Sequence, residues 1–504
     1  MHALPHNSIV AVIGSGAMGS GIAQVAATAG HQVLLYDTRP GAADQAIAAI
    51  GKVYAKLVEK GRMGAVESDL ARERLKSIAS LHEAAQAALV VEAIVENLDA
   101  KRALFTELEV IVGDDCILAT NTSSISVTAI GAPLAKPERL VGMHFFNPVP
   151  LMALVEVISG LATDSGVADT VYATAEGWGK NPVHARSTPG FIVNRVARPY
   201  YAEGLRLLLE QAADVATLDA VLRDCGGFRM GPFELMDLIG HDVNFSVTHS
   251  VFAAYYGDPR FTPSILQQEL VNAGFLGRKT GRGFYRYGDD VAKPEAQAEA
   301  PQPAPASIVY ARAAGLVDAI AARLPGAQAT SAVPGFYCGG AAIHLSDGRS
   351  ATQRARDDGH PDTIVFDLLL DPAKATRIAL ARADGCSEGA WQAAAGLFQA
   401  AGFTVTRLDD VPGLAVMRTV AMLANEAADA VNQGVCSARA VDIAMQKGVN
   451  YPRGPLAWAD AIGLHLVVTV LDNLAAVYGE DRYRVSPLLR RKLAAHPQGA
   501  RFHA

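Results

Sequence analysis

The sequence predicts an α/β domain with a parallel sheet, followed by an all-α domain that occurs twice, the second time after a linker. Three observations predict this arrangement. Short apolar strand patterns alternate with helical patterns up to about residue 187, which is typical of a parallel sheet covered on both faces. The pattern becomes helical from Thr188 onward, and residues that mark this helical part return later in one constant register.

The composition limits the class of protein. At 504 residues the chain is too long for one ordinary core, so about two to four domains are expected. Half of the residues are hydrophobic, which is typical of a globular protein. The net charge of −7 argues against a broad basic surface for nucleic acid. The five cysteines form no CxxC pair, so neither a metal site nor a disulfide framework is indicated. Without a basic leader or a bilayer-length apolar run, we expect a soluble, cytoplasmic protein.

The first domain is expected at 1–187. A buried strand at 8–13 leads into a glycine turn and an alanine-rich helix that ends near Ala29, where Gly30 is placed to terminate it. Further strands are expected at 32–36, 89–93, 117–120, 140–145 and 154–158.

A helical domain is expected at 188–288. Residues 289–306 are rich in proline and alanine and have no apolar face, which predicts an extended, mobile linker. After the linker we expect a degenerate α/β segment at 307–410 and a second helical copy at 411–504.

The second helical copy is inferred from a repeat without gaps. Nine residues of the first copy recur 223 positions later. The first set is Pro189, Gly190, Arg195, Glu203, Asp219, Gly231, Pro232, Asp237 and Gly240, and the second is Pro412, Gly413, Arg418, Glu426, Asp442, Gly454, Pro455, Asp460 and Gly463. Such agreement indicates a duplication. Residues 307–410 are then a shortened remnant of the first domain. They contain the strand-like TIVFDLLL but no glycine motif, so no dinucleotide is expected there.

A glycine motif joins the first strand to the first helix. Gly14-Ser15-Gly16-Ala17-Met18-Gly19 fits GxGxxG, whose glycines permit a tight turn, the approach of a pyrophosphate and close packing of helix on strand. Asp37 ends the second strand 18 residues after Gly19, where a carboxylate can accept hydrogen bonds from ribose hydroxyls. The motif predicts a Rossmann-type domain that binds NAD rather than NADP, although Arg39 nearby would favour NADP.

A histidine and a glutamate are expected to face each other. His144 and Glu156 lie in two strand patterns separated by NPVP, and a chain reversal near Pro150 would place them opposite one another. A carboxylate bonded to one imidazole nitrogen raises the basicity of the ring and leaves the other nitrogen to accept a hydroxyl proton. A lone histidine beside aromatic residues is more often structural, so the inference depends on the pair. Ser123 follows a strand in an NTSS loop, where such sheets bind ligands; capping a helix is its competing role.

Several segments resemble the 3-hydroxyacyl-CoA dehydrogenases. They are, in chain order, GSGAMGSGIA, VVEAIVEN, NTSS, HFFNPVPLMALVEV, STPGFIVNR, MGPFEL and GRKTGRGFY. The resemblance runs from residue 8 to 287, and the later repeat is similar to the same family's helical domain. The long form with GGFRMGPFEL is most similar to bacterial members that oxidise 3-hydroxyadipyl-CoA in phenylacetate breakdown. The resemblance therefore implies oxidation of an L-3-hydroxyacyl-CoA to a 3-oxoacyl-CoA with hydride transfer to NAD.

The resemblance also implies roles for individual residues. His144 would be the catalytic base, Glu156 would orient it, and Ser123 and Asn194 would hydrogen-bond the reacting oxygen of the substrate. The residues implied in the NAD site are Gly14, Gly16, Ala17, Met18, Gly19, Asp37, Glu96, Lys101, Asn147 and Lys279. Asn194 corresponds to Met417 in the repeat, which cannot donate a hydrogen bond, so the second copy is expected to be non-catalytic. Helical domains of two subunits pack together in this family, and the second copy is expected to cover that surface within one chain.

Two basic features are assigned to the substrate. Lys52, Lys56 and Lys60 recur every four residues and share one face of a predicted helix. They suit the phosphates of coenzyme A, and a simple solvated face is the alternative of equal weight. Arg229 is the candidate partner for the far carboxylate of a dicarboxylic acyl chain.

Three other functions are kept as alternatives. The first is a dehydrogenase of 3-hydroxybutyryl-CoA or a fatty 3-hydroxyacyl-CoA, and the second is a dehydrogenase of a free hydroxy acid or sugar acid. The third is a non-catalytic NAD-binding structural protein. The expected partner is an acyl-CoA thioester, with a homo-oligomer as an open alternative, and no nucleic acid, membrane or metal is expected.

Overall fold

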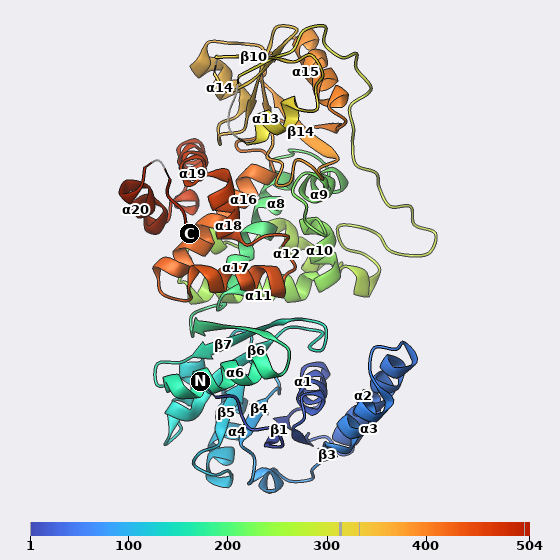
Figure 1. Cartoon of the computed structure of the whole chain (residues 1–504), viewed down its shortest axis with the longest axis vertical. Coiled ribbons are helices and arrows are strands. Elements are labelled where there is room, and N and C mark those ends of the chain that lie inside the picture. The colour runs from blue at the N-terminus through green and yellow to red at the C-terminus, as the bar shows by residue number, and fades with distance from the viewer. Residues whose placement is uncertain (1, 312–314, 332, 498, 504) are drawn as a thin grey trace. The chain divides into compact units, whose positions relative to one another are not determined.

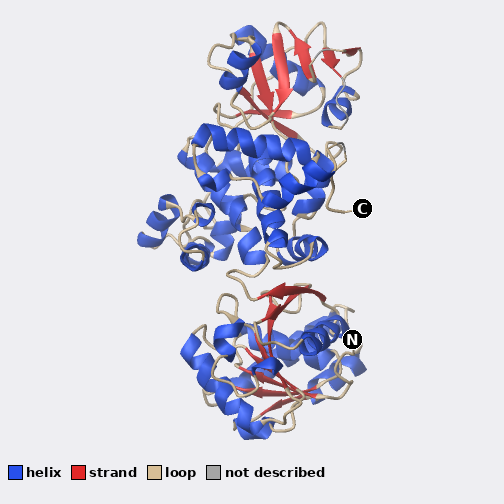
Figure 2. Cartoon of the chain, turned by 90° about the vertical axis from the view of Figure 1, so that its left-hand side faces the viewer, coloured by secondary structure: helices blue, strands red, loops and turns tan. Residues whose placement is uncertain are grey.

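The computed structural model describes residues 2–311, 315–331, 333–497 and 499–503 (Figure 1). The chain divides into two compact units. Unit 1 comprises Met1–Arg195 and Gln433–Asn450, and unit 2 comprises Val196–Asn432 and Tyr451–Ala504. Unit 1 has helices around one sheet, whereas unit 2 has a helical part and a second sheet (Figure 2).

An eight-stranded sheet forms the centre of unit 1, in the order β3-β2-β1-β4-β5-β6-β7-β8. Its strands are β1 (Ile9–Ile13), β2 (Gln32–Tyr36), β3 (Leu75–Ser77), β4 (Leu89–Glu92), β5 (Ile117–Thr120), β6 (Leu140–Phe145), β7 (Leu154–Ser159) and β8 (Asn181–Arg186). All neighbours pair in parallel except β6 and β7, because the short loop between these two permits only a reversal. Every expected strand of this sheet is present. The strands β3 and β8 were not expected, since β3 has only three residues and β8 mixes exposed with buried positions.

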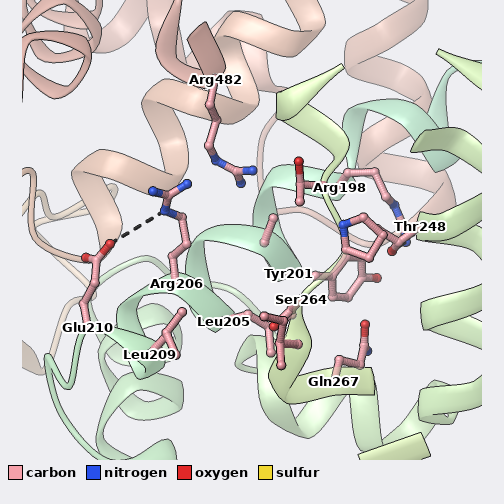
Figure 3. A pocket seen from close by; sticks show the side chains of 14 residues that line it. Arg198, Tyr201, Leu205, Arg206, Leu209, Glu210, Thr248, Ser264, Gln267 and Arg482 are labelled. Carbon is pink, nitrogen blue, oxygen red and sulfur yellow. Dashed lines mark hydrogen bonds and ion pairs between the residues drawn. The ribbon is translucent and has the colours of Figure 1, made fainter. Parts of the chain in front are cut away.

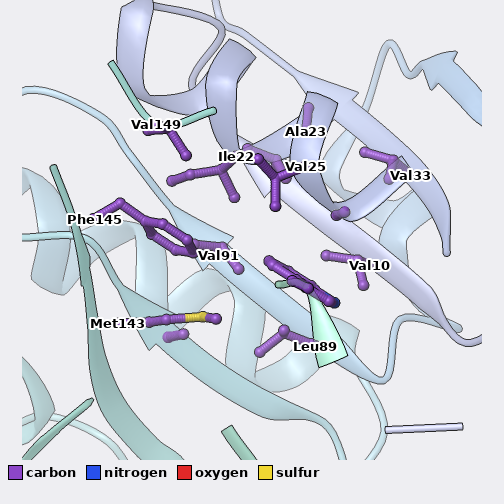
Figure 4. Packing of buried hydrophobic residues seen from close by; sticks show 14 of the residues in the cluster. Val10, Ile22, Ala23, Val25, Val33, Leu89, Val91, Met143, Phe145 and Val149 are labelled. Atoms are coloured by element: carbon purple, nitrogen blue, oxygen red, sulfur yellow. The ribbon is translucent and has the colours of Figure 1, made fainter. Parts of the chain in front are cut away.

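Helices cover this sheet and build its core. They are α1 (Ala17–Thr28), α2 (Ala42–Glu59), α3 (Ala65–Glu73), α4 (Leu98–Ile111), α5 (Val127–Gly131), α6 (Ser165–Gly177) and α17 (Ala438–Gly448), with short 3-10 turns at Leu81–Ala84 and Pro137–Arg139 and the start of α7 (Val193–Val196). Buried aliphatic and aromatic side chains of α1 and the strands pack together, among them Val10, Ile22, Val91 and Phe145 (Figure 4). This apolar layer fixes the strand ends on which the polar residues described below lie.

A helix from the far end of the sequence covers the edge strand β8. Helix α17 packs on β7 and β8, and the amide of Arg186 donates to the carbonyl of Val435 at 2.9 Å. The approach is close, since a Cβ at Gly448 would lie 2.6 Å from Leu154. The compact units therefore differ from the sequence segments, because part of the second helical copy closes a sheet edge that would otherwise be open.

The helical part of unit 2 contains the duplicated helices except α17, which belongs to unit 1. The first set is α8 (Arg198–Leu209), α9 (Val215–Asp224), α10 (Pro232–Ile239), α11 (His241–Ala254) and α12 (Ile265–Asn272), and the second is α16 (Val416–Asn432), α18 (Pro455–Ile462), α19 (Leu464–Tyr478) and α20 (Pro487–Ala495), with α17 as the counterpart of α9. Short 3-10 turns lie at Pro259–Phe261, Arg278–Thr280 and Asp481–Tyr483. The backbone repeats too: φ is 47° at Phe191 and 52° at Leu414, and 99° at Gly240 and 95° at Gly463. The expected duplication of the helical domain is confirmed.

Among the helices that the structure describes, no single one is long and apolar enough to cross a membrane, and only the pair α18 and α19, bent by 100°, passes on combined length and composition.

Reciprocal buried ion pairs join the two helical copies. Helix α8 packs on α16. Arg482 of the second copy lies 2.8 Å from Glu203 of the first, and Arg260 of the first lies 3.2 Å from Glu426, the repeat equivalent of Glu203. Exchange of equivalent contacts is the pattern of an isologous dimer interface, here formed within one chain.

The second sheet of unit 2 has the order β10-β9-β11-β12-β13-β14-β15. Its strands are β9 (Val309–Ala311), β10 (Gln328–Thr330), β11 (Gly335–Cys338), β12 (Ala341–Leu345), β13 (Thr363–Phe366), β14 (Arg377–Arg382) and β15 (Thr404–Arg407), and its helices are α13 (Leu316–Ala321), α14 (Ala351–Asp358) and α15 (Glu388–Ala400). Parallel and antiparallel pairs alternate in this sheet from β12 to β15. It is therefore a mixed sheet, unlike the mainly parallel sheet of unit 1.

The segment 289–306 is extended, as expected, but hydrogen bonds hold it in place. The amide of Gln297 donates to Thr217 at 2.9 Å, and the amide of Glu299 donates to the carbonyl of Val405 in β15 at 2.8 Å. The expected mobility of this linker is therefore corrected, because its backbone is tied both to α9 and to the edge of the second sheet.

Glu203 provides a test of the interface between the copies. It is fully buried and bonded to Arg418 and Arg482. Burial alone would raise the pKa of Glu203, but the charges of the two arginines outweigh it and lower the pKa to about 2. We expect Glu203→Gln to lower the free energy of unfolding of unit 2 at pH 7 by about 3–5 kcal/mol, measured by chemical denaturation. Because the folded-state pKa is below the ordinary value of 4.5, this stabilisation is lost as the pH falls from 4.5 toward 2, and the two proteins should converge there.

The control is Glu480→Gln, which removes a half-exposed carboxylate from Arg206 and should cost less than about 1 kcal/mol. Equal losses in both variants would contradict a special role for the buried pair.

Candidate active site

His144 and Glu156 face each other across β6 and β7. Their Cα atoms are direct partners in the antiparallel register, and His144 Nδ1 lies 2.7 Å from Glu156 Oε2. Since a carboxylate only accepts hydrogen bonds, Nδ1 carries the proton and Nε2 keeps its lone pair. Within the described part of the chain, Nε2 has no hydrogen-bond partner. The predicted pairing of these two residues is confirmed.

Glu156 also holds the turn that leads into α7. Its Oε1 accepts the amides of Ile192 and Val193, each at 3.0 Å, and its side chain is completely buried. Phe146 and Phe191 pack against the imidazole, with ring centroids 4.5 and 5.8 Å away. The orientation of the His144 ring is therefore set by one carboxylate and two aromatic side chains.

The NTSS loop is folded around Glu96. Glu96 Oε1 accepts the amides of Ser123 and Ser124, each at 3.0 Å, and the hydroxyl of Thr122 at 2.7 Å. Burial alone would raise the pKa of Glu96, but these hydrogen bonds and Lys101 outweigh it and lower the pKa. An anionic Glu96 thus fixes the loop that carries Ser123.

Ser123 and Asn194 are neighbours in unit 1. Asn194 Nδ2 donates to the carbonyl of Ser123 at 3.4 Å, and both side chains are half-buried. The competing role of Ser123 as a helix cap falls instead to Ser126, whose hydroxyl accepts the amide of Ala129 in α5. The residues that carry one hydroxyl donor, on Ser123, and one amide donor, on Asn194, are therefore in contact.

Lys101 lies beneath the NTSS loop. Its Nζ is 2.6 Å from Glu92 and 3.2 Å from Glu96, and its side chain is only 1% exposed. Thr120 also donates to Glu92, at 2.6 Å. Lys101 therefore positions Glu96, and a direct contact of its ammonium with a cofactor stays a prediction. Sequence reasoning missed Glu92, although a carboxylate that ends an apolar strand is the signal that would have found it.

The glycine motif shapes the turn before α1. The φ angle of Gly14 is 105°, and a Cβ there would lie 2.5 Å from the carbonyl of Ala93. A Cβ at Gly19 would lie 1.8 Å from the carbonyl of Gly14. At Gly16, in contrast, nothing lies within 4 Å of the Cβ position. Two glycines are thus required by the fold, and the third leaves the N-terminus of α1 open to an anionic group.

Asp37 lines a cavity of about 470 Å³ next to Gly14 and Gly16. It accepts the amide and hydroxyl of Ser15 at 2.9 and 2.7 Å, and both its oxygens bond the guanidinium of Arg39. The hydrogen bonds from Arg39, supported by those from Ser15, hold the pKa of Asp37 well below its usual range. An open helix N-terminus for a pyrophosphate and an anionic acceptor for ribose hydroxyls fit a dinucleotide.

Other residues named from the sequence lie as follows. Ala17 and Met18 begin α1, and Asn147 is exposed after β6. In unit 2, Lys279 lies 2.5 Å from Asp242, and Arg229 is exposed between α9 and α10.

The lysine row is exposed on α2. Lys52 and Lys56 lie in this helix and Lys60 directly follows it, and none of the three has an ion pair within the described residues. These ammonium groups are therefore available to an anion. No group of three or more histidine, cysteine, aspartate or glutamate side chains that would hold a metal is found in the described ranges.

The start of the second helical copy is also bonded to a buried carboxylate, which belongs to the α/β segment that precedes this copy. Asp367, directly after β13, accepts the amides of Ala415, Val416 and Met417 at 2.7 to 2.9 Å. Ala415 and Val416 are the repeat equivalents of the two residues that donate to Glu156. Burial raises the pKa of Asp367 to about 6. Met417, at the position of Asn194, is fully buried, which supports the expectation of a non-catalytic copy.

The roles of Gly16 and Gly19 can be distinguished by substitution. Gly16 lies at φ −65°, which any residue adopts, and faces open space, so Gly16→Ala should fold with an unchanged melting temperature. We expect its dissociation constant for NAD, measured by calorimetry, to rise at least ~10-fold, because the methyl group meets the pyrophosphate.

Gly19→Ala should instead lower the melting temperature, because its methyl group overlaps the carbonyl of Gly14. A destabilised Gly16→Ala, or a stable Gly19→Ala with weak binding, would contradict this division.

Family models of the 3-hydroxyacyl-CoA dehydrogenases match most of the chain. The NAD-binding domain model matches residues 9–188, and the C-terminal domain model matches 190–287 and again 413–501. A model described as the reduced Rossmann-fold domain of 3-hydroxybutyryl-CoA dehydrogenase matches residues 343–412.

Individual relatives agree with the family models. The chain is 44% identical to 3-hydroxyadipyl-CoA dehydrogenase of Escherichia coli K12, over 96% of this chain and 97% of that one. A crystal structure of 3-hydroxybutyryl-CoA dehydrogenase from Escherichia coli K12 has a TM-score of 0.90 and 41% identity, covering 98% of this chain and 99% of that one. The (S)-3-hydroxybutyryl-CoA dehydrogenase of Ralstonia eutropha has a TM-score of 0.54 and 37% identity, covering 56% and 99%. The chain therefore belongs to the 3-hydroxyacyl-CoA dehydrogenase family, with that family's NAD-binding domain in unit 1.

Proposed function

We propose that this dehydrogenase oxidises the 3-hydroxyl group of an L-3-hydroxyacyl-CoA, with 3-hydroxyadipyl-CoA as its main substrate in phenylacetate breakdown. The observation that supports the reaction is the bond between His144 and Glu156, which leaves one imidazole nitrogen ready to accept a proton. The substrate is supported by the 44% identity with the Escherichia coli 3-hydroxyadipyl-CoA dehydrogenase over nearly the whole chain.

His144 acts as the general base. Its Nε2 takes the proton of the substrate hydroxyl while Nδ1 keeps its hydrogen bond to Glu156. The imidazolium formed in this step gains a charge-assisted hydrogen bond to the carboxylate, which stabilises it in a buried site. NAD, when bound, accepts the hydride that leaves the same carbon.

Ser123 and Asn194 act on the substrate oxygen. The Ser123 hydroxyl and the Asn194 amide are donors in adjacent positions, so both can stabilise negative charge on the oxygen as its proton leaves. Removal of one such donor typically lowers the rate by about 10² to 10³. Glu96 acts through the NTSS loop, which it holds in place.

The remaining assignments concern binding. Asn147 contacts NAD, and the row Lys52, Lys56 and Lys60 binds the phosphates of coenzyme A. The enzyme works in the cytoplasm, and any self-association uses surfaces other than the α8 and α16 faces that already pack on each other.

A second candidate substrate is 3-hydroxybutyryl-CoA. It is favoured by the crystal structure of the Escherichia coli 3-hydroxybutyryl-CoA dehydrogenase, which matches this chain over nearly its whole length. The reaction is the same, and only the far end of the acyl chain differs.

The catalytic assignment is tested at His144. We expect His144→Ala to lower kcat for NADH formation by about 10³ while the affinity for NAD is unchanged, because the base is lost and the glycine turn is not touched. Steady-state rates and calorimetric NAD titration measure the two effects.

His82→Ala, which removes an exposed histidine of unit 1, is the control and should keep full activity. Full activity of His144→Ala would favour another base, and absent activity in the unaltered protein with NAD still bound would favour a non-catalytic role.

Substrate choice is tested with a panel of thioesters. We expect kcat/KM for 3-hydroxyadipyl-CoA to exceed that for 3-hydroxybutyryl-CoA at least ~10-fold, the size of one charge-assisted hydrogen bond. Arg229→Ala should reduce this preference toward unity if Arg229 binds the far carboxylate.

An unchanged preference in Arg229→Ala would remove Arg229 from the site without affecting the proposed reaction. Oxidation of free 3-hydroxyadipate as fast as its thioester would contradict the acyl-CoA assignment itself.

A further inference from the structure

A cavity of about 280 Å³ lies in the helical part of unit 2, against α8, α11 and α12 (Figure 3). Apolar side chains such as Leu205 and Leu209 line it together with three arginines, Arg198, Arg206 and Arg482. In the view of Figure 3, Arg198 lies on one side of the cavity and Arg206 on the other. A small cavity with apolar walls and several cations suits a small amphipathic anion.

Two of the three arginines are already neutralised. Arg482 lies 2.8 Å from Glu203, and Arg206 lies 2.6 Å from Glu480. Both of these partner carboxylates bond their guanidinium through two hydrogen bonds. Neither of these arginines needs a further anion.

Among the residues that the structure describes, Arg198 has no carboxylate partner. Its side chain is 5% exposed, and its Nη1 donates only to neutral oxygens, the hydroxyl of Thr248 at 3.0 Å and the carbonyl of Asn244 at 3.5 Å. Its Nε is buried without a hydrogen bond, and its guanidinium lies 4.8 Å from the ring centroid of Tyr201. Burial lowers the pKa of Arg198, and the groups that oppose this shift are Tyr201 and Tyr451, not a carboxylate.

A buried guanidinium without a counter-charge is costly, and proteins normally pair it. We propose that this cavity binds a carboxylate on a short apolar chain, with Arg198 as its counter-ion. The planar guanidinium matches a carboxylate geometrically, and Leu205 and Leu209 provide contacts for methylene groups.

Two sources supply this chemistry. One is a free dicarboxylic or fatty acid, and the other is the far carboxylate of a dicarboxylic acyl-CoA. Only the second source depends on the proposed function. Binding of a free acid and discrimination between thioesters separate the two.

The first experiment titrates the full-length protein with sodium adipate by calorimetry, with adipamide as the uncharged probe. We expect saturable binding of adipate and none of adipamide. Arg198→Met should weaken adipate binding at least ~10-fold, because the charge-assisted hydrogen bonds are lost. Its melting temperature should be equal to or above that of the unaltered protein, since an unpaired buried cation has been removed.

Two further variants guard against loss of folding and against general charge effects. Ala202→Phe fills the cavity with Arg198 intact and should weaken binding as much as Arg198→Met. Arg491→Met, which removes an exposed arginine of α20 that has no ion pair within the described residues, should bind adipate normally.

The second experiment compares kcat/KM for 3-hydroxyadipyl-CoA and 3-hydroxybutyryl-CoA in the same variants. A ratio that falls at least ~10-fold in Arg198→Met and Ala202→Phe, but not in Arg491→Met, assigns the carboxylate to the substrate. An unchanged ratio with specific adipate binding assigns it to a free acid. Absence of saturable adipate binding together with an unchanged ratio overturns the proposal, as does an equal loss of binding in Arg491→Met. If neither thioester is oxidised, the proposed function fails, and adipate binding still decides the inference.

Discussion

The carboxylate of Glu156 determines the geometry of the candidate active site in unit 1, because its two oxygens bond two different segments of the chain. One oxygen bonds His144 Nδ1, and the other accepts the amides of Ile192 and Val193. A fully buried carboxylate is tolerable only when its lone pairs are used in this way. The same group therefore sets both the ring of the proposed base and the turn that leads to Asn194. Substitution of Glu156 would disturb orientation of the base and position of the oxygen-binding donor together, so its kinetic effect cannot be attributed to basicity alone.

The duplication separates these two duties. In unit 2, Asp367 performs the structural one, since it accepts the amides of Ala415 and Val416, which correspond to Ile192 and Val193. Among the described residues no imidazole bonds this carboxylate, and four backbone amides donate to it instead. Each helical copy thus begins with backbone amides that donate to a buried carboxylate, which lies within β7 in unit 1 and directly after β13 in unit 2. The structural duty was retained with a shorter side chain on a different sheet, and the chemical duty was not.

Six of the eight strands of unit 1 and the pairing of His144 with Glu156 were predictable from local patterns, since strand alternation and the NPVP reversal determine which residues face each other. The repeat was predictable because sequence identity at one offset needs no spatial information. The burial of Lys101 and the shared use of Glu96 were not, because both depend on how separate loops pack around one carboxylate. The attachment of the linker was also missed: a segment without an apolar face was read as mobile, although hydrogen bonds to its backbone need no side-chain pattern.

The reciprocal contacts of the helical copies explain what a non-catalytic repeat adds physically. Glu203 meets Arg482, and Glu426 meets Arg260, so each copy supplies the cation that its counterpart needs. In a two-subunit interface such ion pairs exist only while the subunits are associated, so they depend on protein concentration. A covalent link between the copies removes that dependence on protein concentration, because association becomes intramolecular. The buried ion pairs can therefore form at any protein concentration, and the surface of α8 is covered by α16 of the same chain.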